Sequence, residues 1–376
     1  MLLAIKAGFQ IEIICFEFNN WSKANNDQLI KQLGDIKIIK IDAGRKHILK
    51  WAWSILTEKI AQFTNLYYSK SDHFLSQAVS RRSDLIIQNL QNVSMPDLVI
   101  GHNPGAMWPT LFASKIFNCK AGFDVEDYHP GEGDNQKVQS FTRQLMIRIL
   151  PKFDYVSFAS PLILQQLEHD IMITKSCWFT ILNYFPKNEF IAPINNKEGR
   201  IKMVWFSQNI NAGRGLELIL PLLKKYENTV ELHLIGNLNS DFFALHLKNI
   251  ANLFIHSPKQ QNELHKSLAE FDIGLALEPA KDINNDLAVS NKILAYLQAG
   301  LYVIATETSG QKKMLTDWQQ HGVCFDCNNN NLQSILDNVI DNIQTIKSEK
   351  NSRFQAFKNN HWETASEKLL KEWKTV

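Results

Sequence analysis

The densest group of ionisable side chains in the amino-terminal half follows an apolar run that begins at Lys120. The stretch Phe123–Pro130 carries this group, which consists of Asp124, Glu126, Asp127 and His129. A carboxylate or an imidazole at the end of a strand can accept the proton of an attacking hydroxyl group. The spacing favours a catalytic or acceptor-orienting loop, and a solvated acidic loop is the structural alternative.

A glycine-containing turn in the carboxy-terminal half is a candidate phosphate site. Its sequence is typical of a strand, a polar loop and the start of a helix, and its candidate donor-binding residues are Ser207, Asn209, Gly213, Arg214 and Gly215. Free N–H groups at a helix N-terminus bind phosphate, and glycines allow the phosphate to approach closely. An arginine can add a bidentate contact. An ordinary turn with a solvated arginine explains the pattern equally well.

A second group of anion-binding candidates follows the polar loop that begins at Glu278. Ser290 is a good N-cap and Gly300 a good C-cap, so we expect a helix between them. Its first turn would carry Asn291 and Lys292 at the carboxyl ends of the strands, where open α/β sheets bind ligands. The alternative is a capped surface helix with a solvated lysine. Farther along, the backbone at Ser309 and Gly310 could form another anion site.

The elements that position these residues alternate regularly along the chain. Short apolar or β-branched runs are separated by helical patterns, which predicts βαβ units and parallel sheets. The predicted strands are Ile11–Phe16, Ile36–Ile41, Asp97–Gly101, Lys120–Val125, Tyr155–Ser160, Trp178–Asn183, Ile201–Ser207, Val230–Gly236, Leu253–His256, Phe271–Glu278, Leu301–Glu307 and Gly322–Asp326.

The polar stretch 192–199 divides these strands into two sets. We therefore expect a first domain over residues 1–191, a second over 200–350, and a final helical segment over 351–376. Residues 1–8 are typical of the end of a helix that leads into the first predicted strand. A doubly wound domain would begin one strand earlier, so we expect either that the first strand is absent or that the start of the sequence lies too far downstream.

Composition excludes several classes of protein. The chain has 376 residues, with Lys+Arg 40 against Asp+Glu 38 and a net charge of +2. This balance lacks the basic footprint of a nucleic-acid binder, so we expect no nucleic-acid partner. No run reaches the ~18 apolar residues of a membrane-spanning helix, and the start lacks the pattern of a secretory signal. Five cysteines in a chain of this length favour a cytosolic protein with reduced thiols.

Residues 45–68 form an amphipathic helical pattern with tryptophans and nearby lysines. A basic amphipathic helix with tryptophans can rest on anionic lipid, which would place the protein at the inner face of a membrane. The simpler interpretation is a helix with one face packed against the domain core.

The motifs together resemble the GT-B glycosyltransferases of the family-4 type. Ser290–Ala305 resembles their nucleotide-sugar loop and helix, and 213–217 resembles the turn after the first strand of their second domain. Pro96–Asn103 and Phe123–Pro130 resemble the paired loops that face their active-site cleft. His361–Glu363 resembles the start of their returning terminal helix, so the similarity spans nearly the whole chain.

The resemblance implies two Rossmann-like domains and transfer of a sugar from a nucleoside-diphosphate sugar to a glycan or lipid-linked glycan, with retention, in surface polysaccharide synthesis. It implies no resident cofactor and no metal, and it assigns His102 and Asn103 to the acceptor side. The family's pair of glutamates is absent, because Leu287 and Ala295 stand at those positions. Glu278 and Asp286 are the nearest replacements for a carboxylate that contacts the donor.

Two other interpretations stay open on these residues. The missing glutamate pair and first strand would also suit a GT-B-like subunit that binds a nucleotide sugar without catalysis. A different two-domain α/β protein, such as a periplasmic-type binding protein, would need a secretion signal upstream of Met1.

Overall fold

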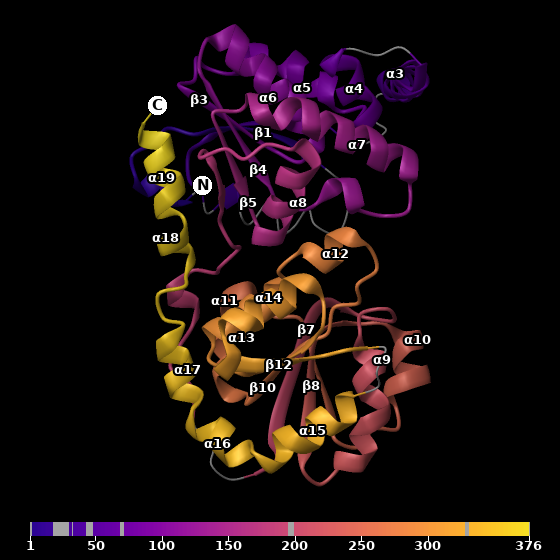
Figure 1. Ribbon diagram of the computed structural model, residues 1–376, viewed down its shortest axis with the longest axis vertical. Coiled ribbons are helices and arrows are strands. Elements are labelled where there is room, and N and C mark those ends of the chain that lie inside the picture. The colour runs from indigo at the N-terminus through magenta and orange to yellow at the C-terminus, as the bar shows by residue number, and fades with distance from the viewer. Residues whose placement is uncertain are drawn as a thin grey trace. The chain divides into compact units, whose positions relative to one another are not determined.

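The computed structural model describes residues 2–17, 30–31, 33–42, 48–67, 71–194, 199–327 and 331–375. The chain divides into two compact units (Figure 1). The first comprises Met1–Ile181 together with Glu367–Val376, and the second comprises Leu182–Ser366. Each unit is a mixed α/β structure in which all described strand pairs are parallel.

The first unit contains a four-stranded sheet in the order β3-β4-β5-β6 and a separate pair, β1-β2. Its strands are β1 (Glu12–Glu17), β2 (Lys37–Asp42), β3 (Leu98–His102), β4 (Lys120–Val125), β5 (Tyr155–Phe158) and β6 (Trp178–Thr180). Its helices are α1 (Leu2–Lys6), α3 (Ile48–Tyr67), α4 (Asp72–Val79), α5 (Ser83–Asn89), α6 (Pro104–Phe117), α7 (Gln136–Ile149), α8 (Pro161–Ile171) and α19 (Glu367–Lys374).

The second unit is built on a six-stranded sheet in the order β12-β11-β10-β7-β8-β9. The strands are β7 (Ile201–Ile210), β8 (Val230–Leu238), β9 (Leu253–His256), β10 (Ile273–Ala276), β11 (Tyr302–Thr306) and β12 (Gly322–Phe325). The helices are α9 (Leu216–Ile219), α10 (Ser240–Phe242), α11 (Gln261–Ser267), α12 (Ile283–Leu287), α13 (Asn291–Gln298), α14 (Ser309–Asp317), α15 (Leu332–Asp341), α16 (Ile343–Ser348), α17 (Lys350–Ala356) and α18 (Trp362–Ala365).

Helices cover both faces of this six-stranded sheet (Figure 1). One buried cluster joins Trp205 and Leu275 of the strands to α9 and α15. A second cluster joins Val204 and Ala276 to α13 and α14. Because alternate strand residues enter opposite clusters, the strands are apolar throughout, as parallel strands covered on both faces are.

All the strands expected from the sequence are present, and β4 and β9 have the expected bounds. Both halves are thus α/β structures with parallel strands, and α1 precedes β1 as the sequence predicts. β7 is three residues longer than predicted, because it continues to Ile210 and therefore takes Asn209 into the strand.

The chain passes from the first unit to the second after Ile181 and returns after Ser366, and not within the stretch 192–199. Residues 195–198 of that stretch lie outside the described part. Residues 182–191 fall in the second unit, where the Phe185 N–H donates to Gln298 Oε1 (2.9 Å). Residues 351–366 fall there too, and Arg353 Nε donates to the Gly300 carbonyl (3.2 Å).

The last helix, α19, belongs to the first unit. Trp373 Nε1 donates a hydrogen bond to Tyr155 Oη (2.9 Å), and the Trp373 ring meets Phe9 edge-on at 5.8 Å. These contacts tie the end of the chain to β5.

Helix α3 occupies most of the predicted amphipathic segment 45–68, of which residues 45–47 and 68 are not described. It packs on α4, where Gln62 Nε2 of α3 donates a hydrogen bond to the Ala78 carbonyl oxygen (3.2 Å). Among the described residues, no helix is long and apolar enough to span a bilayer.

Candidate active site

Three polar residues lie side by side at the carboxyl ends of three neighbouring strands in the first unit. His102 of β3 is in register with Asp124 of β4, and Asp124 is in register with Ser157 of β5. His102 Nε2 lies 3.4 Å from Asp124 Oδ2, and Ser157 Oγ donates to the other carboxylate oxygen. His102 Nδ1 also lies 3.6 Å from Glu126 Oε1. The structure thus brings one acceptor-side candidate and two catalytic candidates together.

The three ionisable groups of this cluster shift one another's pKa. Partial burial opposes protonation of His102, but Glu126 and Asp124 outweigh it, and the pKa of His102 is raised. Burial raises the pKa of Asp124 against the opposing effects of His102 and Ser157. The interaction with His102 lowers the pKa of Glu126. A carboxylate with a raised pKa is a stronger proton acceptor, so Asp124 has the better basicity and the exposed Glu126 the better access.

Asp127 and His129 occupy the turn beyond this cluster. Asp127 is half-buried, whereas His129 is buried and its Nδ1 lies 2.9 Å from Glu132 Oε2. His129 Nε2 has no hydrogen-bond partner among the described residues. His129 also contributes to lowering the pKa of Glu126. Because His129 is buried, we infer that it supports the acidic loop and does not contact a substrate at the surface.

Asn103 follows His102 in a conformation that few non-glycine residues adopt, with φ 67° and ψ 149°. It stands at the N-cap of α6 without a side-chain capping bond, and Pro104 begins the helix. Such strained residues concentrate at functional sites. The sharp turn lets β3 end at His102 and the helix begin at once.

A tyrosine packed on a glycine supports the cluster from one side. A Cβ atom on Gly122 would lie 2.1 Å from the Tyr155 ring, so β4 requires glycine here. Tyr155 is buried, and both its burial and the Asp124 charge raise its pKa. The sequence pattern did not indicate this residue, because a buried strand tyrosine gives no local signal of its neighbours.

The predicted phosphate turn of the second unit has the expected glycine conformations. Gly213 and Gly215 have φ values of 72° and 85°. A Cβ atom on Gly215 would lie 2.7 Å from the Leu277 side chain, so the turn packs directly against the end of β10. The Gly213 N–H donates to Glu217, and Arg214 is exposed.

The helix after this turn is short. α9 spans only Leu216–Ile219 and continues as a 3₁₀ helix over Leu220–Tyr226. Ser207 and Asn209 flank an irregularity in the β7–β8 pairing, where a Cβ atom on Gly236 would lie 2.2 Å from the Ser207 carbonyl oxygen. Side chains therefore supply most of the positive charge at this turn.

Two predicted donor-binding residues form an ion pair with each other. Lys292 Nζ lies 2.5 Å from Glu278 Oε1 and 5.6 Å from the centre of the Trp205 ring. Lys292 is buried, with 9% of its surface exposed, whereas Asn291 beside it is exposed. The Glu278 N–H is held by Thr306 Oγ1 (2.9 Å), so the pair is fixed at the ends of β10 and β11.

The fully buried side chain of Gln311 joins the elements around this pair. Its Nε2 donates to the carbonyl oxygens of Ala276 (3.2 Å) and Thr306 (2.9 Å). Its Oε1 accepts from Ser290 Oγ (3.2 Å), the residue that caps α13. Gln311 was not among the sequence candidates, although its place after Gly310 marks the start of a helix.

The predicted anion site at Ser309 and Gly310 is occupied by a carboxylate of the chain itself. Asp286 accepts from the Ser309 N–H (2.9 Å) and from Ser309 Oγ (2.6 Å). A Cβ atom on Gly310 would lie 2.1 Å from the Ala288 carbonyl oxygen, so this glycine allows the loop to approach α14. Asp286, which the sequence assigned to the donor, here neutralises the N-terminus of α14.

A further cation of this region, Lys281, was missed in the sequence. A Cβ atom on Gly213 would lie 3.3 Å from Lys281 Nζ. Its only local signal was its place in the polar loop after Glu278. Elsewhere, the described part of the chain contains no group of three His, Cys, Asp or Glu residues arranged to hold a metal ion.

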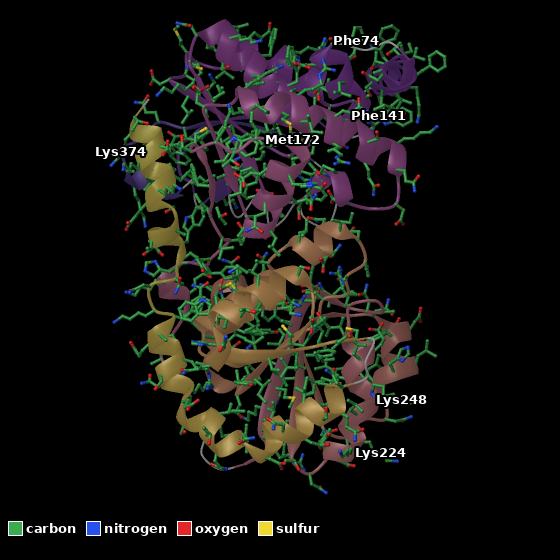
Figure 2. All side chains as sticks on the ribbon, viewed as in Figure 1. Phe74, Phe141, Met172, Lys224, Lys248 and Lys374 are labelled. Atoms are coloured by element: carbon green, nitrogen blue, oxygen red, sulfur yellow. The ribbon has the colours of Figure 1, made fainter. Side chains whose placement is uncertain are left out.

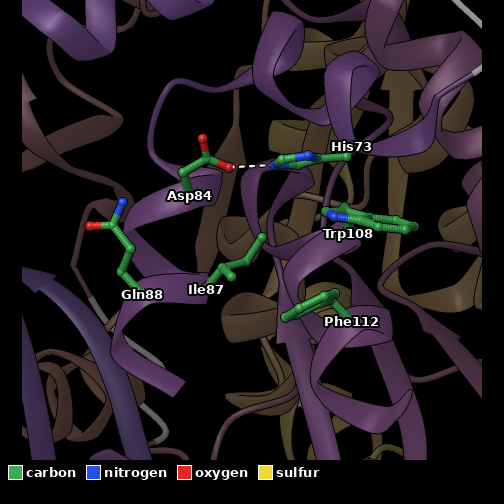
Figure 3. A pocket seen from close by; sticks show the side chains of 6 residues that line it. All are labelled: His73, Asp84, Ile87, Gln88, Trp108 and Phe112. Carbon is green, nitrogen blue, oxygen red and sulfur yellow. Dashed lines mark hydrogen bonds and ion pairs between the residues drawn. The ribbon is translucent and has the colours of Figure 1, made fainter. Parts of the chain in front are cut away.

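Away from these residues, the first unit contains a cavity of about 260 Å³ between α4, α5 and α6 (Figure 3). It is lined by His73, Asp84, Ile87, Gln88, Trp108 and Phe112. His73 Nε2 lies 2.7 Å from Asp84 Oδ1, and its ring stacks on Trp108 at 6.3 Å. No residue that the sequence singled out lines it.

Comparison with known structures identifies the architecture. A TarM variant from S. aureus, in complex with fondaparinux, α-GlcNAc-glycerol and UDP, matches with a TM-score of 0.65 and 12% identity over 99% of this chain and 94% of that chain. HepE from Anabaena in complex with UDP-glucose matches with a TM-score of 0.60 and 14% identity over 97% of this chain and 100% of that chain. The chain has the GT-B fold.

Other comparisons add detail to the GT-B match. The UDP-forming α,α-trehalose-phosphate synthase from Burkholderia vietnamiensis has a TM-score of 0.63 and 9% identity over 98% of this chain and all of that chain. Another TarM structure matches 78% of this chain, which spans only 57% of that TarM chain, with a TM-score of 0.58. No family model and no curated sequence matches the chain.

Proposed function

We propose that this GT-B protein transfers a sugar from a nucleoside-diphosphate sugar to a hydroxyl group of a glycan or lipid-linked glycan. The observation that carries this proposal is the separation of charge between the two candidate sites. The first unit presents Asp124 and Glu126 around His102, and the second presents Arg214 and Lys281. Acidic groups suit a hydroxyl acceptor, and basic groups suit a diphosphate.

The residues of the second unit would stabilise the leaving group. The diphosphate gains negative charge as the glycosidic bond breaks, and fixed cations near that charge lower the barrier. Arg214 and Lys281 supply these cations, so the proposed reaction is independent of metal. Activity that persists in EDTA would support this part of the proposal, and activity restored only by a divalent cation would contradict it.

The residues of the first unit would bind and orient the acceptor. Asp124 and Glu126 accept hydrogen bonds from its hydroxyl groups, and His102 holds both carboxylates in place. The family resemblance implies retention at the anomeric carbon, and trehalose-6-phosphate synthase, another structural match, is described as acting with retention. We place the reaction in surface polysaccharide synthesis on the same resemblance.

The test is turnover of a panel of UDP- and GDP-sugars, followed by release of the nucleotide. UDP-sugars come first, because TarM and HepE are described in complex with UDP. Release of UDP or GDP that depends on an added glycan supports a transferase. Nucleotide binding without turnover on any tested acceptor favours the non-catalytic subunit instead, and absence of nucleotide binding contradicts both.

We further propose that α3 rests on the inner face of a membrane and brings the enzyme to a lipid-linked acceptor. Four large apolar side chains on α3 are exposed: Trp53 (66%), Leu56 (49%), Ile60 (49%) and Phe63 (66%). Their spacing places them along one face of the helix. The sequence adds Arg45, Lys46, Lys50 and Lys59 to this segment. Apolar burial and attraction to anionic lipid together favour interfacial binding.

Vesicle sedimentation tests this membrane contact. We expect binding to phosphatidylglycerol vesicles and weaker binding to phosphatidylcholine vesicles. The double variant Trp53→Glu, Phe63→Glu should lose binding, whereas Leu245→Glu, a matched change at an exposed apolar residue of the second unit, should keep it. Equal sedimentation of both variants would exclude α3 as the contact.

A further inference from the structure

The second unit holds fewer available cations at its phosphate turn than its sequence suggests. Lys292 is buried and paired with Glu278 at 2.5 Å, so most of its charge is already neutralised. Asn209 carries no charge, and the Gly213 N–H already donates to Glu217. Arg214 alone would then face a diphosphate that carries at least two negative charges.

We propose that Lys281 is a diphosphate-binding residue that supplies the second cation of this turn. This inference rests on the proposed function, since it assumes that the second unit binds a nucleoside diphosphate. A Cβ atom on Gly213 would lie 3.3 Å from Lys281 Nζ, so the ammonium group lies close beside this glycine. In the described part of the chain, neither Arg214 nor Lys281 is engaged in an ion pair.

The loop that carries Lys281 is anchored on both sides of it. On one side, Glu278 is bound to Lys292 and its backbone N–H to Thr306 Oγ1. On the other side, Asp286 is bound to Ser309. The Lys281 N–H itself donates to the Pro279 carbonyl (2.8 Å), which closes a tight turn. The backbone of the loop is therefore held in place around Lys281, whose exposed side chain extends to Gly213.

Gly213 makes this approach possible. Its φ of 72° is costly for other residues, and the absence of a side chain keeps the space in front of the turn open. Arg214 follows directly in the chain. An anion in front of Gly213 can thus contact Arg214 and Lys281 at once, and a charge-assisted hydrogen bond to each contributes more than a neutral one.

Calorimetric titration with UDP and GDP tests this assignment on the full chain. We expect Lys281→Gln to weaken nucleotide binding roughly tenfold, as loss of one charged hydrogen bond does. Uridine and guanosine lack phosphate, so any binding of theirs should be unchanged. Lys281→Arg should keep most of the affinity, and the salt dependence of binding should be smaller in Lys281→Gln than in wild type.

The matched control is Lys224→Gln. Lys224 is an exposed lysine in the 3₁₀ segment that precedes β8, and Figure 2 shows it on the outer surface of the second unit. Its removal changes the net charge equally and should leave nucleotide affinity unchanged. Thermal unfolding of each variant confirms that it is folded.

The possible failures are distinguishable. Equal nucleotide affinity of wild type and Lys281→Gln overturns the assignment of Lys281 and leaves the proposed function standing. An equal loss in Lys224→Gln shows a general charge effect and also overturns it. If wild type binds neither UDP nor GDP, the proposed function fails, and the role of Lys281 fails with it.

Discussion

The two units carry their candidate sites at the same place in the fold and equip them with opposite charge. In both, polar residues gather at the carboxyl ends of parallel strands. In the first unit, Glu126 is exposed beside His102. In the second, Glu278 and Asp286 are bound to Lys292 and Ser309, and Arg214 and Lys281 are exposed. In both units, the side chains that remain available at the strand ends decide which chemistry the site can support.

The units also share a packing contact between a tyrosine ring and a strand glycine, which supports the carboxyl ends of the strands. In the first, the Tyr155 ring lies on Gly122 of β4, and in the second the Tyr296 ring lies on Gly274 of β10. Both tyrosines are buried. The common packing shows that the difference between the sites lies in their polar groups and not in their support.

The largest expected effect is the loss of sugar transfer when Asp124 of the first unit is replaced. Asp124→Asn should reduce sugar transfer by roughly 10²–10⁴-fold, because the amide cannot accept the acceptor proton. Nucleotide affinity, measured by calorimetry, should stay within twofold of wild type (roughly) because the donor site lies in the second unit. A loss of nucleotide binding in Asp124→Asn would contradict the division of roles.

Replacing the glycine of the tyrosine–glycine contact should destabilise both units to a similar extent. Gly122→Ala and Gly274→Ala place a Cβ atom 2.1 Å and 2.2 Å from a tyrosine ring atom. Each should lower the free energy of unfolding of its own unit by about 1–3 kcal/mol. Limited proteolysis, with fragments assigned to each unit, measures this. A variant that loosens only the other unit would refute the comparison.

The acids of the two sites should differ in their contribution to stability. Glu278→Gln leaves the buried Lys292 without its ion-pair partner and should destabilise the second unit by about 1–2 kcal/mol, less than for a fully buried pair. Glu126→Gln removes an exposed carboxylate and should change stability by less than about 0.5 kcal/mol. Denaturant unfolding of both variants gives the difference. Equal effects would show that Glu278 is not engaged as described.

The last predictions concern pH, and the two effects have opposite signs in the two units. The pKa of His102 is raised above 6.5, so its contribution to stability is present below pH 6.5 and lost as pH rises through the folded-state pKa. Burial lowers the pKa of Lys350 to about 8 from 10.5, so the unfolded chain binds more protons between these values. Stability of the second unit should therefore rise over that window.

Two variants isolate these pH effects. The difference in unfolding free energy between wild type and His102→Gln should shrink by about 1 kcal/mol or less from pH 6 to pH 8. The difference between wild type and Lys350→Met should change in favour of wild type from pH 8 to pH 10. A His102→Gln difference that grows with pH would contradict the raised pKa.

The sequence predicted the fold well because the fold depends on local pattern. The apolar runs at Lys120–Val125 and Leu253–His256 correspond to β4 and β9 residue for residue, since strands covered on both faces need no polar positions. The terminal helix was also expected, because Leu369 and Trp373 give it an apolar face, and Trp373 packs on the first unit.

The candidate sites were less predictable, because they depend on partners distant in the chain. His102 and Asp124 meet only through strand register, and Lys292 meets Glu278 only through the fold of the loop between them. No sequence pattern indicates that Asp286 binds the N-terminus of α14 or that Lys281 lies close to Gly213. Side-chain pairing of this kind is decided by tertiary structure and not by propensity.

The contact between Trp373 and Tyr155 has a consequence for how the protein is made. These residues are 218 positions apart, and the whole second unit lies between them in the chain. At a synthesis rate of roughly 5–20 residues per second, the first unit would wait on the order of 10–40 s for its last helix. During that interval the Tyr155 hydroxyl and the Phe9 ring lack their partner, so the first unit completes its packing only after the second unit has been synthesised.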